Sequence, residues 1–101
     1  MIRHVILYKF RASASEEERQ NALDTLRALG QSIPEVREWS IGKQVYPSST
    51  AYDLAQVSGF ENAEALERYR NHPNHIRTKT LLSEIADRAV VDYEYSSEEE
   101  G

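Results

Sequence analysis

The sequence predicts one α+β domain, in which helices cover a four-stranded antiparallel sheet on one face. Three observations lead to this prediction. Polar and apolar residues alternate in four segments, which is typical of strands. Helical periodicity and capping signals occupy the segments between them, and the resulting order is β-α-β-β-α-α-β without an internal repeat. A chain of 101 residues is long enough for one such domain and too short for two.

The first strand is predicted at residues 2–10, where the side chains alternate between two faces. His4, Ile6 and Tyr8 lie together on one face, and apolar side chains also occur on the opposite face. A strand that is apolar on both faces indicates a sheet that is covered on both sides.

A helix is predicted after Ser15, which is a good N-cap residue and forms a capping box with Glu18. Gly30 fits the position that ends a helix, and Pro34 follows shortly after it. The apolar stripe of this helix consists of Ala22, Leu23, Leu26 and Leu29.

Two strands follow, at residues 36–45 and 52–60. The turn cluster YPSST between them is short, which predicts an antiparallel pair. Trp39 is expected in the core or at an interface between copies of the chain. Gly42 and Gly59 indicate bulges or places where other groups approach the backbone closely.

A second helix is predicted from Asn62, a suitable N-cap. Pro73 is expected to stop it, because the residue before a proline is pushed out of the helical region. His72 would then lie at the C-terminal end of this helix, where a charged imidazole is favourable. A third helix is predicted from Asn74 and a last strand at residues 88–95. This order is that of a ferredoxin-like fold.

In the last strand, Asp92 shares a face with Val90 and Glu94, while the other face is mostly apolar. If Asp92 points inward it needs a partner, for which Arg3 and Arg88 are the candidates. Helices cover only one face of a ferredoxin-like sheet. The apolar residues on the other face predict a symmetric homodimer that stacks two sheets.

The charge of the chain argues against a nucleic-acid partner. The net charge is −5, from 12 basic and 17 acidic residues, and three of the acids lie at residues 98–100. We expect residues 96–101 to form an acidic disordered tail behind a domain at residues 1–95. Without those three acids the charges nearly balance, so the domain offers no basic surface for phosphate backbones.

The composition also bears on cofactors and location. The absence of cysteine excludes disulfides and thiolate metal sites. No apolar run approaches the roughly 18 residues of a membrane span, and the N-terminal segment alternates like a strand instead of forming a signal-sequence core. We therefore expect a cytoplasmic protein without membrane contact. No nucleotide or flavin motif occurs, so no cofactor is expected.

The segment YRNHPNHIRT, residues 69–78, concentrates the side chains that can carry chemistry. An imidazole can take a proton α to a carbonyl at neutral pH, and a phenol can donate to the enolate oxygen that forms. Tyr69 and His75 would be such a pair, although structural roles in a core or a helix cap are the alternative for both. A metal site is disfavoured, because zinc needs three or four convergent ligands and Pro73 constrains His72 and His75.

Four stretches in order, MIRHVILYKF, YDLAQVSGFENAEALERY, HPNH and RAVVDYEY, resemble the stress-responsive α/β-barrel (Dabb) domain family across residues 1–95. The resemblance implies a ferredoxin-like protomer and a homodimer whose two sheets form a barrel. It does not imply one activity. Plant polyketide cyclases of the olivetolic acid cyclase type belong to the family, and many members have no assigned reaction.

Those cyclases use a tyrosine and a histidine in the pattern Y-x-x-H-P-x-H, which here begins at Tyr69 and ends at His75. The resemblance thus implies that Tyr69 and His75 are catalytic, and we expect His4, Tyr8 and His72 to contact the substrate in a cavity between sheet and helices. Three functions are open: a cofactor-independent cyclase, lyase or isomerase on a carbonyl compound, a non-catalytic stress-associated or ligand-binding dimer, or a cofactor-free monooxygenase-like barrel.

Overall fold

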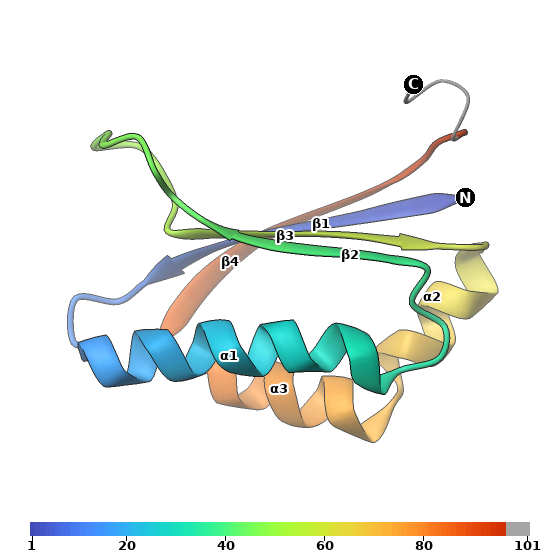
Figure 1. Ribbon diagram of the computed structural model, residues 1–101, viewed down its shortest axis with the longest axis horizontal. Coiled ribbons are helices and arrows are strands. Elements are labelled where there is room, and N and C mark those ends of the chain that lie inside the picture. The colour runs from blue at the N-terminus through green and yellow to red at the C-terminus, as the bar shows by residue number, and fades with distance from the viewer. Residues whose placement is uncertain (97–101) are drawn as a thin grey trace.

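The computed structural model describes residues 1–96 and contains the predicted elements in the predicted order (Figure 1). The acidic tail predicted at residues 96–101 lies, except for Ser96, outside the described residues. The elements are β1 (Ile2–Phe10), α1 (Glu16–Ser32), β2 (Glu38–Lys43), β3 (Leu54–Phe60), α2 (Ala63–Arg70), α3 (Pro73–Ser83) and β4 (Ala86–Glu94).

The four strands form one antiparallel sheet in the order β2-β3-β1-β4. This order and the helix positions confirm the ferredoxin-like α+β fold. β1 lies in the centre of the sheet, and its register places His4 directly opposite Ser58 of β3 and Asp92 of β4. Residues that lie opposite each other share a face of the sheet, so the register brings His4 and Asp92 to the same face.

All three helices lie on one side of the sheet (Figure 1). The main core fills the space between α1, α3 and the sheet; its buried residues are Ile6, Tyr8, Ala22, Leu23, Leu26, Leu54, Leu82 and Ala86. A second cluster lies near α2; its buried residues are Leu29, Ile33, Phe60, Ala65, Leu66 and Tyr69. Within residues 1–96, no helix is long and apolar enough to cross a membrane.

The first helix forms its predicted capping box but does not end where the sequence predicts. The Ser15 hydroxyl accepts from the Glu18 amide at 3.1 Å, and the Glu18 carboxylate accepts from the Ser15 amide at 2.8 Å. The helix continues through Gly30 to Ser32, so the prediction that Gly30 ends it is wrong. The reason is packing: a Cβ on Gly30 would lie 2.2 Å from Cγ of Trp39. Gly30 therefore makes room for the indole, whose Nε1 donates to the carbonyl of Leu26 at 3.0 Å.

Replacing Gly30 with alanine is expected to lower the free energy of unfolding by about 1–3 kcal/mol, because the added methyl group overpacks the helix–sheet contact. This loss opposes the gain of about 1 kcal/mol that alanine brings to a helix. Urea denaturation measures the net change in the free energy of unfolding. The matched control is Gln31→Ala, at the next position and exposed, which we expect to be neutral. A Gly30→Ala protein as stable as wild type would contradict the packing role.

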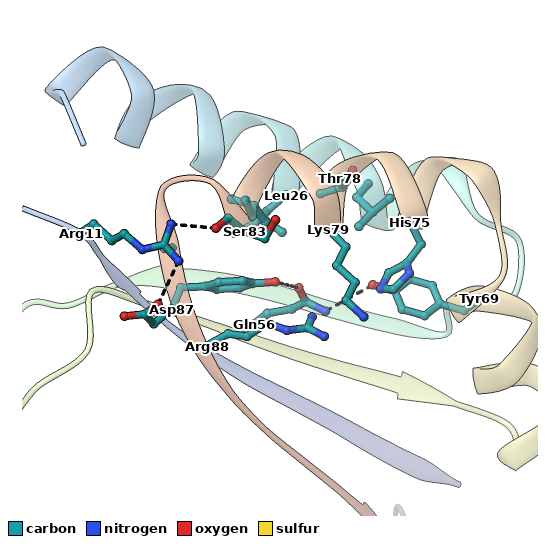
Figure 2. Close-up of a pocket in the computed structure, with 14 residues that line it drawn as sticks. Arg11, Leu26, Gln56, Tyr69, His75, Thr78, Lys79, Ser83, Asp87 and Arg88 are labelled. Atoms are coloured by element: carbon teal, nitrogen blue, oxygen red, sulfur yellow. Dashed lines mark hydrogen bonds and ion pairs between the residues drawn. The ribbon is translucent and has the colours of Figure 1, made fainter. Parts of the chain in front are cut away.

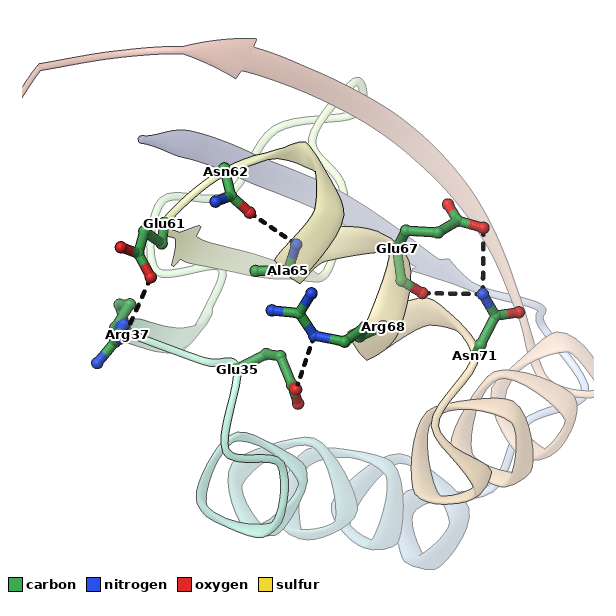
Figure 3. Close-up of polar contacts among 8 residues, drawn as sticks. All are labelled: Glu35, Arg37, Glu61, Asn62, Ala65, Glu67, Arg68 and Asn71. Carbon is green, nitrogen blue, oxygen red and sulfur yellow. Dashed lines mark hydrogen bonds and ion pairs between the residues drawn. The ribbon is translucent and has the colours of Figure 1, made fainter.

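Side chains fix both ends of α2 (Figure 3). The Asn62 side chain accepts from the Ala65 amide at 2.9 Å, as the N-cap prediction requires. At the other end Asn71 caps the helix and donates to the carbonyl of Glu67 at 2.9 Å and to its carboxylate at 3.1 Å. Two ion pairs are drawn in the same view (Figure 3): Arg68 with Glu35 at 3.2 Å and Arg37 with Glu61 at 3.4 Å.

The corner between α2 and α3 differs from the prediction in the role of His72. This residue is the N-cap of α3, and its Nδ1 accepts from the amide of Asn74 at 3.1 Å. Placing it at the C-terminal end of α2 was therefore wrong. Pro73 takes the first helical position of α3, where its missing N–H costs nothing. Pro73 separates the two helices as predicted, and His72 contributes to the corner as the N-cap of α3.

Candidate active site

A cavity of about 230 Å³ opens between the sheet and helices α1 and α3 (Figure 2). β1, β3 and β4 contribute Tyr8, Gln56 and Arg88 to it, α2 contributes Tyr69, and α3 contributes His75 among others. The full lining consists of Tyr8, Arg11, Leu26, Leu29, Gln56, Tyr69, His75, Thr78, Lys79, Leu82, Ser83, Ala86, Asp87 and Arg88.

His75 is buried in the wall of this cavity and its imidazole is held in one tautomer. Its Nδ1 lies 3.0 Å from the carbonyl oxygen of Arg70. A carbonyl only accepts, so Nδ1 carries the proton in this contact and Nε2 is the basic nitrogen of the neutral ring. Burial lowers the pKa of His75, the bond to Arg70 opposes that effect, and the nearby charges of Arg88 and Lys79 lower the pKa further. The imidazole is therefore neutral, and a base, at pH 7.

Tyr69 is fully buried, and its ring centroid lies 4.6 Å from that of His75. Burial raises the pKa of Tyr69 above its usual range, so the phenol keeps its proton. The amide of Gln56 donates to the phenol oxygen over a long 3.5 Å. That bond uses the oxygen as an acceptor and does not use the phenol hydrogen. The ring also packs against Phe60 at 4.9 Å, which fixes its position.

Tyr8 completes a short polar chain along the floor of the cavity. Its hydroxyl donates to the Gln56 side-chain oxygen at 3.4 Å, and Gln56 in turn donates to Tyr69. Burial raises the pKa of Tyr8 to about 12, although the positive charge of Arg88 opposes the shift. The cavity therefore presents two protonated phenols and one neutral imidazole.

His4 lies beside this cavity, in an adjoining hollow of about 270 Å³ that shares His75, Lys79 and Arg88 with it. Its Nδ1 contacts the carboxylate of Asp92, while its Nε2 is buried and has no hydrogen-bond partner among residues 1–96. The partner of Asp92 is thus His4, and the expectation of Arg3 or Arg88 was wrong. The physical reason is the register, which places Asp92 directly opposite His4.

The structure brings together three of the five predicted site residues, Tyr8, Tyr69 and His75, in one cavity. His4 lies close by, with its ring 6.1 Å from that of Tyr69. His72 does not line the cavity, because its ring is used to cap α3.

The lining residues that the sequence did not identify include three with polar or charged ends near His75: Gln56, Lys79 and Arg88. Gln56 carried a signal, since it is a polar residue on the apolar face of a predicted strand. Lys79 and Arg88 carried none, because an exposed cation on a helix or strand is ordinary. Among residues 1–96, no group of three or more His, Asp or Glu side chains is arranged to hold a metal ion.

The comparisons with known proteins decide the family. The model of the stress-responsive A/B barrel domain, Dabb, matches residues 2–95. This chain belongs to the Dabb family. An uncharacterised Streptomyces coelicolor protein is 34% identical over 94% of this chain and 100% of its own length.

Two solved structures illustrate the range of proteins that share this Dabb fold. A dimeric protein of unknown function from Bacteroides fragilis is 28% identical, with a TM-score of 0.78 over 93% of this chain and 95% of the other. A hydroxynitrile lyase from Passiflora edulis is 17% identical, with a TM-score of 0.81 over 94% and 96%. The likeness to the lyase concerns the fold alone.

Proposed function

We propose that this Dabb protein binds a small organic carbonyl compound in the cavity between sheet and helices and transfers a proton on it without a cofactor. The reaction class is that of a cyclase, lyase or isomerase, with His75 as base and Tyr69 as hydrogen-bond donor. One observation carries the proposal: the His75 ring, whose Nδ1 contacts the Arg70 carbonyl, lies 4.6 Å from the ring of the buried Tyr69 in the wall of a cavity.

The proposed step is a proton abstraction. Nε2 of His75 takes a proton from the carbon next to the carbonyl, the electron pair of that C–H bond forms the enolate, and the enolate oxygen accepts a hydrogen bond from Tyr69. The proton then returns from the imidazolium to the same or another atom of the ligand. A positioned base contributes about 10²–10⁴-fold. One oxyanion donor contributes about 10²–10³-fold.

One protein of the same fold is a lyase, which is among the proposed reaction classes. The Passiflora edulis protein is a hydroxynitrile lyase with this fold, so the fold is compatible with lyase activity. Because that protein is 17% identical, its substrate is not carried over to this chain.

The test is deuterium exchange at the α-carbon of a neutral β-keto ester, ethyl 2-methyl-3-oxobutanoate, followed by proton NMR in D₂O. We expect the protein to accelerate exchange over buffer and over a heat-denatured sample at the same concentration. Exchange no faster than in those controls would contradict the proposal. A rate that needs oxygen would favour monooxygenase-like chemistry instead.

A non-catalytic, ligand-binding role is the second candidate. It is favoured by the packing of Tyr69, whose ring contacts both Phe60 and His75 and whose oxygen is bonded to Gln56. These contacts also suit a residue that only holds α2 against the sheet. The exchange assay separates the two functions, because a protein that binds the ester without exchanging its proton is a binding protein.

We also propose that the protein acts as a homodimer through the face of the sheet that the helices leave bare. Val57, Val5 and Val91 lie in register across three strands on that face, and Val91 is 56% exposed. Apolar side chains in such a row favour contact with a second sheet. The Bacteroides fragilis protein of the same fold is dimeric.

Replacing Val91 with arginine is expected to convert the dimer to a monomer, because a symmetric contact would bury two unpaired charges. Sedimentation velocity at micromolar concentration measures the change. The matched control is Val90→Arg, on the opposite face of the same strand and 45% exposed, which we expect to remain dimeric. A wild-type protein that sediments as a monomer, or a Val91→Arg protein that stays dimeric, would contradict the interface.

A further inference from the structure

Four charged side chains line the cavity, and only two of them neutralise each other. Arg11 pairs with Asp87 at 3.1 Å and also donates to the carbonyl of Ser83 at 2.8 Å. Within the part of the chain that the structure describes, neither Lys79 nor Arg88 forms an ion pair with a carboxylate. The lining of the cavity therefore carries an excess of two positive charges.

The two cations come from opposite walls. Lys79 extends from α3 and Arg88 from β4, and in Figure 2 the ends of both side chains point to the space beside Gln56 and His75. Both also line the hollow that contains His4. The pKa of His75 is lowered in part by each of them, which agrees with cations close to the base.

This arrangement suits a carboxylate. The guanidinium of Arg88 can bind both oxygens of a planar carboxylate, and the ammonium of Lys79 adds a compact charge from the other side. A cavity of about 230 Å³ has room for a ligand of a few carbon atoms. The apolar part of such a ligand would lie against Leu26, Leu29 and Leu82, which line the same cavity.

We propose that the cavity takes a small oxo acid, whose carboxylate is bound between Lys79 and Arg88 while its ketone lies at Tyr69 and His75. The position of the ketone depends on the proposed function, whereas the binding of the carboxylate does not. Lys79 and Arg88 determine which ligands bind, and they take no part in the transfer of the proton.

The test compares 4-oxopentanoate with its neutral amide, 4-oxopentanamide, by NMR titration of the full-length ¹⁵N-labelled protein. We expect the acid to bind about ten-fold more tightly than the amide, because hydrogen bonds between charged groups are stronger than neutral ones. Lys79→Gln and Arg88→Gln should each weaken binding of the acid by about five- to ten-fold and leave binding of the amide unchanged. The control is Arg27→Gln, which removes the same charge from an exposed position on α1 and should change neither affinity.

Two results would overturn the proposal. One is equal binding, or no binding, of both probes to the wild-type protein. The other is an equal loss in Arg27→Gln, since it would indicate an effect of net charge alone. The β-keto ester of the exchange assay has no carboxylate. If the protein exchanges the ester proton but binds the acid no more tightly than the amide, the carboxylate site is refuted and the proposed function stays intact. Tighter binding of the acid without any exchange of the ester would support the carboxylate site and refute the proposed function.

Discussion

The His75→Asn protein is expected to exchange the α-proton of the β-keto ester about 10²–10⁴-fold more slowly than wild type. Asparagine is chosen because its side-chain amide reaches the position of Nδ1 and can keep the hydrogen bond to the Arg70 carbonyl, which is 3.0 Å long in the native protein. The substitution therefore removes Nε2, the proposed base, and preserves the local structure.

The control for this variant is His72→Asn, three residues earlier. Asparagine is a good N-cap residue, so α3 should keep its cap and the exchange rate should stay at the wild-type value. Urea denaturation verifies that both variants fold. A His75→Asn protein that is folded and retains the wild-type rate would show that His75 is not the base.

The same assay has an expected pH dependence. The base is the neutral imidazole, and burial lowers the pKa of His75 below its ordinary value of about 6.5. The exchange rate should therefore rise with pH and reach half of its plateau below pH 6.5, so that the protein is almost fully active at pH 7. A profile whose midpoint lies clearly above pH 6.5 would contradict the electrostatic account of the site.

The second large effect is expected for Tyr69→Phe, which should slow exchange by about 10²–10³-fold. Phenylalanine keeps the ring that packs against Phe60 and His75 and removes only the donor of the hydrogen bond to the enolate. Since burial raises the pKa of Tyr69, the wild-type rate should not decline in mildly alkaline solution.

Tyr8→Phe is the matched control for the second phenol of the cavity. Tyr8 donates to Gln56 at 3.4 Å and has no proposed contact with the reacting carbonyl, so its loss should cost much less than that of Tyr69. Equal losses in the two variants would mean that the phenols act only through the general polarity of the cavity.

The fold was predictable because its signals are local. The capping box of Ser15 and Glu18, the Asn62 cap and the alternation in β1 each depend on residues close together in the sequence. The predicted helix end at Gly30 was wrong for the same reason. The rule for helix ends is local, whereas Gly30 is needed for its contact with the ring of Trp39, which belongs to another element.

The site was predictable only in part. Tyr69 and His75 belong to one short pattern and were identified together. The pairing of His4 with Asp92 spans 88 positions and follows from the strand register, which the sequence does not specify. Lys79 and Arg88 become neighbours of the cavity only when α3 packs over β4. The residues that bear on ligand choice were therefore not recognised as cavity residues from the sequence.

The most direct test of the proton-transfer pair is the exchange rate of the Tyr69→Phe, His75→Asn double variant beside those of the wild type and the two single variants, at pH 7 and with ester binding verified by NMR. Residues that act as one unit are not additive. The double variant should therefore lose little more than the more severely affected single variant. A folded, ester-binding double variant that exchanges the proton as fast as wild type would contradict the assignment of this cavity as a catalytic site.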